Sequence, residues 1–184
     1  YTKGIENVFG SDINLKKWKF TINDTKNFRL AGEFKYKIGI GGFLNNKKVF
    51  IQDFQHFNGN RSAAASEYVN SFQLAPYYAN STDAGFYSFT HLEHHFNGLL
   101  TNKIPFFKKL NWNLVAGSNA FYINKNSNYT EVFVGLENIF KILRVDFVTA
   151  YANGRKSTTG FRLGFGGIVG GSVKRQGNSV SISL

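Results

Sequence analysis

The sequence contains no cysteine and no methionine, and only 2 of its 184 residues are proline. Without cysteine, the chain can form no disulfide bond and has no thiolate for catalysis or metal binding. It also has no run near the roughly 20 apolar residues that a membrane-spanning helix requires. Membrane-spanning strands need no such run and give only a weak alternating signal, so its absence does not exclude a membrane barrel.

The first residues show neither an initiator methionine nor the apolar run of a signal peptide. We therefore expect the chain to be the C-terminal part of a longer protein, with further residues before Tyr1.

Aromatic residues and glycine are abundant: the chain has 20 Phe, 9 Tyr, 2 Trp and 19 Gly. With so little proline, this composition suits long and continuous antiparallel strands. The net charge of +11 favours nucleic acid, anionic lipid or an acidic ligand as a partner, or else reflects only a solvated basic surface. No segment resembles a motif of the folds that bind single-stranded nucleic acid, so we expect no nucleic acid partner.

A hairpin over residues 129–151 shows the clearest pattern, with a turn predicted near residues 138–141. Its second strand separates apolar from charged side chains, with Leu143, Val145 and Phe147 on one face and Arg144 and Asp146 on the other. Its first strand does the same, with Val132, Val134 and Leu136 opposite Glu131 and Glu137. Such alternation indicates strands that have different surroundings on their two faces.

Alternation predicts five further strands, over residues 15–24, 28–42, 85–96, 110–122 and 159–167. No segment has a convincing helical pattern. Residues 43–84 form a long connection with strand-like pieces only at 49–53 and 72–78, and such connections are uncommon unless functional or disordered. Residues 1–14 are predicted to be a connecting segment, and residues 168–184 a tail or short final strand.

Two all-β architectures explain these two-faced strands. A soluble sandwich buries the apolar faces in its core and leaves the polar faces in water. A transmembrane barrel turns the apolar faces to lipid and keeps the charges in its lumen, which avoids roughly 2–4 kcal/mol for each cation at the bilayer midplane. The strands exceed the usual length of about 5–6 residues and match the roughly 9–11 residues of a tilted transmembrane strand. We therefore predict an antiparallel transmembrane β-barrel.

Five short phrases also stand out: Asn45-Asn46-Lys47-Lys48, His56-Phe57-Asn58-Gly59-Asn60, His95-Phe96-Asn97-Gly98, Asn102-Lys103-Ile104-Pro105 and Gly135-Leu136-Glu137-Asn138-Ile139-Phe140-Lys141. These phrases are similar to a Bacteroidota outer-membrane family that joins a carboxypeptidase-regulatory-like domain to a C-terminal barrel. The layout of residues 83–167 resembles the last strands of the assembly-and-secretion barrel superfamily of Gram-negative outer membranes. That superfamily includes the central barrel of the BAM complex and the two-partner secretion transporters.

The resemblance implies a barrel of about 16 strands in the cell outer membrane, with this chain as its C-terminal part. The implied function is a component or accessory of outer-membrane protein assembly, secretion or lipid traffic. The implied partners are outer-membrane lipid and lipopolysaccharide, the rest of the barrel N-terminal to residue 1, and other outer-membrane complex subunits. The alternatives are a small closed eight-stranded barrel with a surface-binding or structural role, and a soluble β-sandwich binding module.

In that superfamily a long extracellular loop folds into the lumen, where its Arg-Gly-aromatic motif pairs with acidic residues. Residues 43–84 occupy the corresponding place, and the nearest match comprises His56, Phe57, Asn58, Gly59, Asn60 and Arg61. No arginine precedes this glycine, so Arg61 is the candidate replacement and the lock departs from the family pattern. The resemblance also places the link at 97–109 and the hairpin turn in the periplasm.

The second candidate site consists of charged residues on the presumed lumen face: Glu93, Glu131, Glu137, Arg144, Asp146 and Arg162. They form either a ladder of ion pairs that keeps the wall polar, or anchors for the folded-in loop. His91, Glu93 and His95 have a spacing that can hold Zn²⁺, but a fourth ligand is not evident, which favours a hydrogen-bonded wall. A triad of Asp53, a serine and His56 has no supporting motif. We expect no catalytic residue, metal or cofactor, and we do not predict an enzyme.

Overall fold

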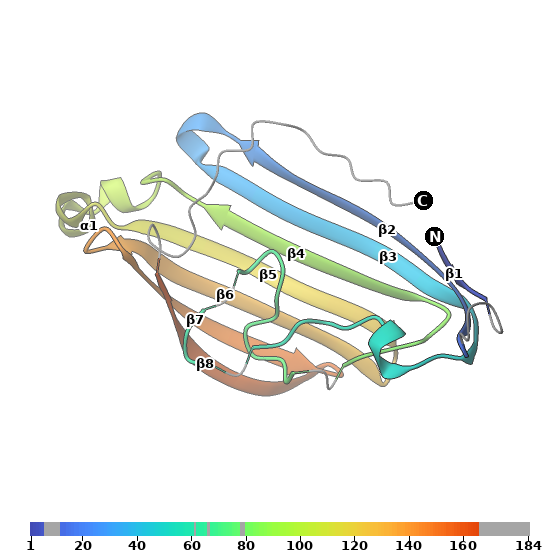
Figure 1. The fold of residues 1–184 in the computed structure, drawn as a ribbon. Coiled ribbons are helices and arrows are strands. Elements are labelled where there is room, and N and C mark those ends of the chain that lie inside the picture. The colour runs from blue at the N-terminus through green and yellow to red at the C-terminus, as the bar shows by residue number, and fades with distance from the viewer. Residues whose placement is uncertain (6–11, 61, 66, 78–79, 166–184) are drawn as a thin grey trace.

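The computed structural model describes residues 1–5, 12–60, 62–65, 67–77 and 80–165. These residues form one eight-stranded sheet in which each strand pairs antiparallel with its neighbour in sequence (Figure 1). The strands are β1 Thr2–Gly4, β2 Asn14–Asn27, β3 Glu33–Lys48, β4 Tyr87–His95, β5 Asn113–Asn124, β6 Ser127–Ile139, β7 Leu143–Ala152 and β8 Arg155–Phe165. The sheet is open, because β1 and β8 do not pair with each other in the described part of the chain. The predicted antiparallel all-β fold is confirmed.

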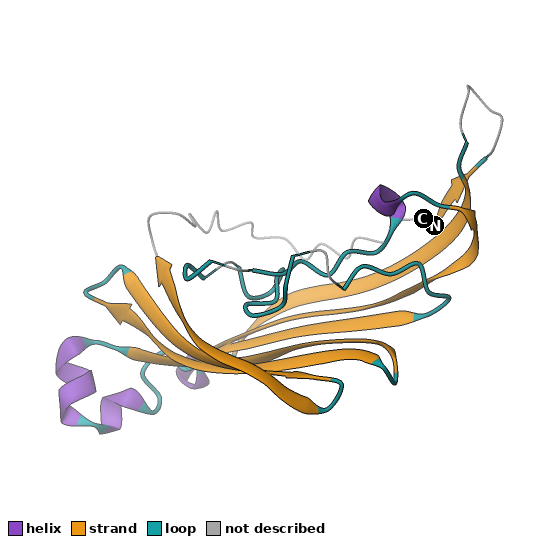
Figure 2. Ribbon diagram, turned by 90° about the horizontal axis from the view of Figure 1, so that it is seen from below, coloured by secondary structure: helices purple, strands orange, loops and turns teal. Residues whose placement is uncertain are grey.

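The sheet is curved, and the connection between β3 and β4 lies over its concave side (Figure 2). We call this connection, residues 49–86, the covering loop. Its described residues form isolated β-bridges, of which one joins Ala64 to Leu163 of β8. There the amide of Ala65 donates to the Leu163 carbonyl at 2.7 Å, and the Leu163 amide donates to the Ala63 carbonyl at 2.9 Å. The covering loop therefore occupies part of the outer edge of β8.

The helices of the described residues are short: the 3-10 helices η1 Arg29–Ala31, η2 Ile51–Asp53 and η3 Thr101–Lys103, and the α-helix α1 Pro105–Leu110. Helix α1 has no counterpart among the elements predicted from the sequence. It begins at Pro105, whose fixed φ suits the first position of a helix, and is followed by Asn111 in the left-handed conformation with a φ of 55°. None of these helices is long and apolar enough to cross a membrane.

Several predicted boundaries differ from the structure. Thr2–Gly4, expected to belong to a connecting segment, pairs with residues 15–17 as β1. The third strand continues through bulged pairs with β2 to Lys48, so the covering loop begins six residues later than predicted. The strand-like piece at 49–53 contains the helix η2 in place of a strand. The predicted tail at 168–184 lies outside the described residues.

The two faces of the sheet are inverted relative to an ordinary soluble sheet. The convex face exposes a set of large apolar side chains: Phe20 and Ile22 of β2, Ile38 and Ile40 of β3, Val132 and Val134 of β6, Phe147 of β7, and Phe161 and Leu163 of β8. On the concave face lie buried polar and charged side chains, among them His91, Glu93, Asn119, Glu131 and Asp146. The central convex positions of β3 to β8 carry no Asp, Glu, Lys or Arg among the described residues.

The core lies between the concave face and the covering loop. It consists of aromatic and small side chains from both: Phe57, Phe72 and Ala75 from the loop, and Phe43, Tyr87, Phe89, Phe121, Tyr129 and Ala150 from the strands. The ring of Phe57 stacks on Phe121, with centroids 4.3 Å apart and planes 10° apart. The covering loop thus supplies part of the core and is a packed element of the fold.

Candidate functional site: the anchors of the covering loop

Glu131 is the first anchor of the covering loop. Strand β6 places its side chain on the concave face, where it is completely buried. The carboxylate accepts hydrogen bonds from the backbone amides of Gln73 at 2.7 Å and Leu74 at 3.1 Å. It also accepts from Asn119 Nδ2 at 2.7 Å and from the Tyr129 hydroxyl at 2.9 Å. A buried carboxylate with four donors is well satisfied, and two of those donors belong to the loop backbone.

Arg162 of β8 holds the same point of the loop from the other side. Its Nε donates to the Gln73 carbonyl at 2.8 Å. The amide of Gln73 donates to Glu131, so both backbone groups of this residue are bound by charged side chains of the wall. Because Glu131 and Arg162 stand on different strands, they hold Gln73 between β6 and β8.

A second anchor is built around Arg144 of β7. Its Nε lies 2.8 Å from Asp146 Oδ2, and its Nη1 lies 2.5 Å from Glu93 Oε1. The Tyr68 hydroxyl of the loop donates to Asp146 Oδ2 at 2.8 Å. The Tyr68 ring also lies under the guanidinium, whose carbon is 4.2 Å from the ring centroid. One loop residue therefore makes both a hydrogen bond and a cation–π contact with this ion-pair network.

Tyr68 is held in its protonated form, as a hydrogen-bond donor. Its burial raises the pKa of the hydroxyl far above the ordinary value, and the neighbouring Asp146 carboxylate raises it further. The proton is therefore retained and is directed at Asp146, as the hydrogen bond requires.

His95 of β4 extends this network towards β6. Its Nδ1 lies 2.8 Å from Glu137 Oε2, and its Nε2 lies 3.4 Å from Glu93 Oε1. His91 points elsewhere, with its Nδ1 3.0 Å from the Asn119 side-chain oxygen. Within the described residues, no three His, Asp or Glu side chains are arranged to hold a metal ion. The spacing that suggested a zinc site instead serves two separate hydrogen-bonded groups.

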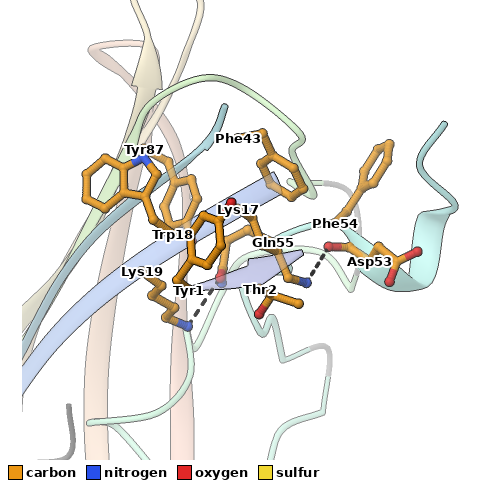
Figure 3. Close-up of a pocket in the computed structure, with 10 residues that line it drawn as sticks. All are labelled: Tyr1, Thr2, Lys17, Trp18, Lys19, Phe43, Asp53, Phe54, Gln55 and Tyr87. Atoms are coloured by element: carbon orange, nitrogen blue, oxygen red, sulfur yellow. Dashed lines mark hydrogen bonds between the residues drawn. The ribbon is translucent and has the colours of Figure 1, made fainter. Parts of the chain in front are cut away.

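Lysines of β2 and β3 contact the covering loop at the opposite side of the sheet. Lys17 Nζ donates to the Asp53 carbonyl at 3.0 Å, and Lys19 Nζ donates to Gln55 Oε1 at 3.2 Å (Figure 3). These four residues line a cavity of about 250 Å³ together with Tyr1, Thr2, Trp18, Phe43, Phe54 and Tyr87. Lys37 Nζ donates to Asn70 Oδ1 at 2.6 Å. All three lysines bind neutral acceptors, in contrast to the paired charges of β4 to β8.

The predicted loop lock lies within the covering loop but contributes mainly to its internal packing. Phe57 is buried in the core. Gly59 forms an isolated parallel β-bridge with Phe72. It has no room for a side chain, since a Cβ would lie 2.3 Å from the Ala75 carbonyl. Asn60 is also buried, and its Nδ2 donates to the Ala64 carbonyl at 2.8 Å.

The outer residues of the predicted lock also bind other parts of the covering loop. Asn58 Nδ2 donates to the Asn70 carbonyl at 3.3 Å. His56 Nδ1 lies 2.6 Å from Ser81 Oγ. Asp53, the third residue of the triad considered above, has a buried carboxylate oxygen without a hydrogen-bond partner among the described residues. Arg61 lies outside the described residues.

The residues that join the loop to the charged wall were missed in the sequence. They are Tyr68, Ser71, Gln73 and Leu74 in the loop and Asn119 in β5, whose Nδ2 also contacts the Ser71 carbonyl at 3.3 Å. Most of these contacts use backbone groups, which every residue has, so no side-chain pattern marks them. The usable signals were Glu131 and Asp146, acids on the predicted inner faces of two neighbouring strands.

Gly135 provides the space for the second anchor. A Cβ built on this residue would lie 2.0 Å from Asp146 Oδ1 and 2.5 Å from the Val145 carbonyl. We expect Gly135→Ala to displace Asp146 and lower the free energy of unfolding by about 1–3 kcal/mol, measured by urea titration. Gly85→Ala is the control, because its Cβ would lie 3.7 Å from the Phe43 carbonyl, an ordinary van der Waals distance. Equal stability of the two variants would contradict this account of Gly135.

These features define a class of all-β protein: an antiparallel sheet whose charged face is covered by its own anchored loop, while its apolar face stays exposed. Residues 1–136 match a family model described as "Family of unknown function (DUF5686) C-terminal domain". The chain therefore belongs to this family. Comparisons with curated proteins and with solved structures gave no match.

Proposed function

We propose that this chain forms part of the wall of an outer-membrane β-barrel, with its convex face in lipid and the covering loop in the lumen. One observation carries the proposal: the apolar face of the sheet is exposed, and the charged face is buried under the loop. A row of apolar side chains crosses three strands in register, from Val134 through Phe147 to Phe161. These side chains are 46%, 42% and 66% exposed.

Such a surface is unfavourable in water and favourable in lipid. Exposed apolar patches of this extent usually mark an interface or a membrane contact. A soluble sandwich would bury this face against a second sheet, and the described residues contain a single sheet. Charges on the opposite face agree with the alternation of barrel strands, which turn apolar residues to lipid and polar residues to the lumen.

The open sheet requires further strands to complete such a barrel. Open edges in the hydrocarbon region would leave backbone groups without partners, at a cost of several kcal/mol for each. The eight described strands do not close on themselves, which disfavours the small eight-stranded barrel. In the proposal, the remaining strands precede residue 1, as the resemblance to the larger assembly barrels implies.

Within the outer membrane we assign the protein to protein assembly, secretion or lipid traffic, as a component or accessory in Bacteroidota. The support is the resemblance of layout to the assembly-and-secretion superfamily, together with a long loop bound to buried charges of the wall. Depletion of the protein is expected to change the amounts of other outer-membrane proteins or the lipid composition of that membrane. If depletion changes neither the outer-membrane proteins nor the lipid composition, the assignment to assembly, secretion or lipid traffic is refuted. The proposal that the chain forms part of a barrel wall does not depend on this result.

Cell fractionation tests the membrane location directly. We expect the protein in the outer-membrane fraction, resistant to alkaline carbonate and released only by detergent. Its migration in gels should differ between unheated and boiled samples, as for closed barrels. Recovery in the soluble fraction without detergent would overturn the proposal.

A charged residue introduced on the convex face tests whether that face contacts lipid or water. Val134 lies at the middle of β6, so Val134→Lys is expected to destabilise a membrane barrel by roughly 2–4 kcal/mol and to lower the fraction with heat-modifiable migration. In a soluble protein the same exposed substitution would stay within about 0.5 kcal/mol. Thr130→Lys is the matched control on the same face of the same strand, near its end, where a smaller cost of about 0–1 kcal/mol is expected. Equal and negligible effects at both positions would contradict the lipid-facing assignment.

A further inference from the structure

The three connections at one end of the sheet form a basic rim. They are residues 28–32 between β2 and β3, residues 96–112 between β4 and β5, and residues 140–142 between β6 and β7. They contain five cations and no acidic residue: Arg29, Lys103, Lys108, Lys109 and Lys141. All five are exposed, and none forms an ion pair with a described residue. The connections at 49–86, 125–126 and 153–154, at the opposite end, contain three acids and two cations.

The three connections of the rim adjoin one another. The Asn138 side chain at the start of the β6–β7 turn donates to the Asn111 carbonyl at 2.7 Å. On the other side, a Cβ built on Gly32 would lie only 3.0 Å from Phe96 Cα, and His94 Nε2 at the end of β4 lies 2.9 Å from the Ala31 carbonyl. Figure 2 shows the helices of the β4–β5 connection projecting at this end of the sheet. The charges of the rim therefore belong to one continuous edge.

Neighbouring strand residues do not offset this charge. Asp24 pairs with Lys26 at 2.5 Å, and Glu33 pairs with Lys35 at 3.3 Å. Glu137 is bound to His95, and Glu93 and Asp146 are bound to Arg144. The acids closest to the rim in sequence are thus already paired, and the five cations keep their full attraction for an external anion.

The rim also carries large exposed apolar side chains: Phe28, Leu30, Leu99, Leu100, Ile104, Phe106, Leu110, Phe140 and Ile142. Leu30 is 86% exposed, Phe140 80% and Phe106 62%. Apolar side chains interspersed with lysine, with no acid among them, are typical of segments that lie in the interface of an anionic membrane. A partner made only of water-soluble anions would contact the cations and leave these side chains in water.

An aromatic band joins the rim to the convex face. The His94 ring lies 5.9 Å from Phe34, 6.4 Å from Phe28 and 4.4 Å from Phe96, measured between ring centroids. Phe34 also stacks with Tyr36, the next convex residue of β3, at 5.9 Å. Aromatic girdles mark the level of the membrane–water interface on barrel strands. The rim lies just beyond this band, at the depth where lipid headgroups would be.

We propose that the basic rim binds the headgroups of anionic phospholipids, with its apolar side chains inserted between them. The inference rests on the proposed function for its position in a membrane. Short turns of outer-membrane barrels lie on the periplasmic side and long loops on the outside. The 38-residue covering loop (residues 49–86), which is longer than any connection of the rim, leaves from the opposite end. The resemblance also places the link at 97–109 in the periplasm, so the rim faces the phospholipid leaflet and not lipopolysaccharide.

Lipid retention by the purified full-length protein tests this proposal. Native mass spectrometry in detergent compares phosphatidylglycerol with phosphatidylethanolamine of the same acyl chains. We expect the wild type to prefer phosphatidylglycerol and a variant with Lys103→Gln, Lys108→Gln and Lys109→Gln to bind it at least about tenfold more weakly, since each cation near an anionic surface contributes about fivefold or more. The control carries Lys47→Gln, Lys125→Gln and Arg155→Gln at the opposite end and should stay within about twofold of the wild type.

Three outcomes would overturn the proposal that the rim binds anionic phospholipid. The first is an unchanged affinity of the rim variant for phosphatidylglycerol, and the second is an equal loss of affinity in the control variant. The third is that the rim variant loses affinity for lipopolysaccharide and not for phosphatidylglycerol. The barrel wall is judged separately by fractionation of the same proteins. A soluble wild type that still binds phosphatidylglycerol vesicles through these lysines would refute the proposed barrel wall and support lipid binding by the rim. An integral membrane protein without a preference for phosphatidylglycerol would support the barrel wall and refute lipid binding by the rim.

Discussion

Arg144→Met is expected to lower the free energy of unfolding by about 3–5 kcal/mol, because removing one partner of a buried ion pair leaves the others without compensation. Arg144 binds both Glu93 and Asp146. Asp146 is completely buried and Glu93 nearly so, so water cannot replace the lost guanidinium. The variant also removes the cation above the Tyr68 ring. Urea titration followed by tryptophan fluorescence measures the effect.

Two further variants show whether uncompensated charge is the cause. Arg155→Met removes an exposed arginine at the start of β8 and should change the free energy of unfolding by less than about 0.5 kcal/mol. Adding Glu93→Gln and Asp146→Asn to Arg144→Met should restore a large part of the loss, because neutral amides tolerate burial better than unpaired carboxylates. A loss below about 1 kcal/mol for Arg144→Met alone, or no recovery in the triple variant, would contradict this role.

Much of the sheet could be predicted because its two faces differ so strongly. Residues 143–147 alternate perfectly between apolar and charged, and the structure places Phe147 on the convex face and Asp146 on the concave one. The turn predicted at 138–141 lies where Asn138 near the end of β6, and Phe140 and Lys141 of the β6–β7 connection, have positive φ. A period of two survives wherever each strand face has a constant environment.

The elements that were missed are too short to show a period. Strand β1 has three residues, and its pairing with β2 depends on β2 and not on its own sequence. Helix α1 has six residues, fewer than two turns, so the apolar positions of a helix cannot repeat within it. Proline at its start was the only local mark.

The path of the covering loop was the least predictable part. In the described part of its resemblance-based lock, residues 56–60, Phe57 packs in the core and Asn60 binds the Ala64 carbonyl within the loop. The contacts with the charged wall fall at Tyr68, Gln73 and Leu74. The alternation of the strands places Glu131 and Asp146 on the inner face but does not identify their partners, since a carboxylate binds a backbone amide of any residue.

Glu131→Leu is expected to release the covering loop while the strands remain paired. The substitution removes the acceptor for the amides of Gln73 and Leu74 and for the side chains of Asn119 and Tyr129. Each buried donor left without a partner costs about 1–3 kcal/mol. A loss of about 3–5 kcal/mol from the free energy of loop opening would accelerate amide exchange in residues 67–77 by about 100-fold or more.

Hydrogen–deuterium exchange of the protein in its membrane or detergent environment measures this release, with limited proteolysis of the loop as a second readout. Glu131→Gln retains the shape and one acceptor oxygen, so it should show a smaller acceleration confined to the same residues. Glu67→Leu is the control for a change in loop charge, because Glu67 is exposed and its carboxylate bonds Asn70 within the loop. An equal rise of exchange in β5, β6 and the loop of the Glu131→Leu variant would mean that Glu131 supports the whole sheet, and would refute its role as a specific anchor of the covering loop.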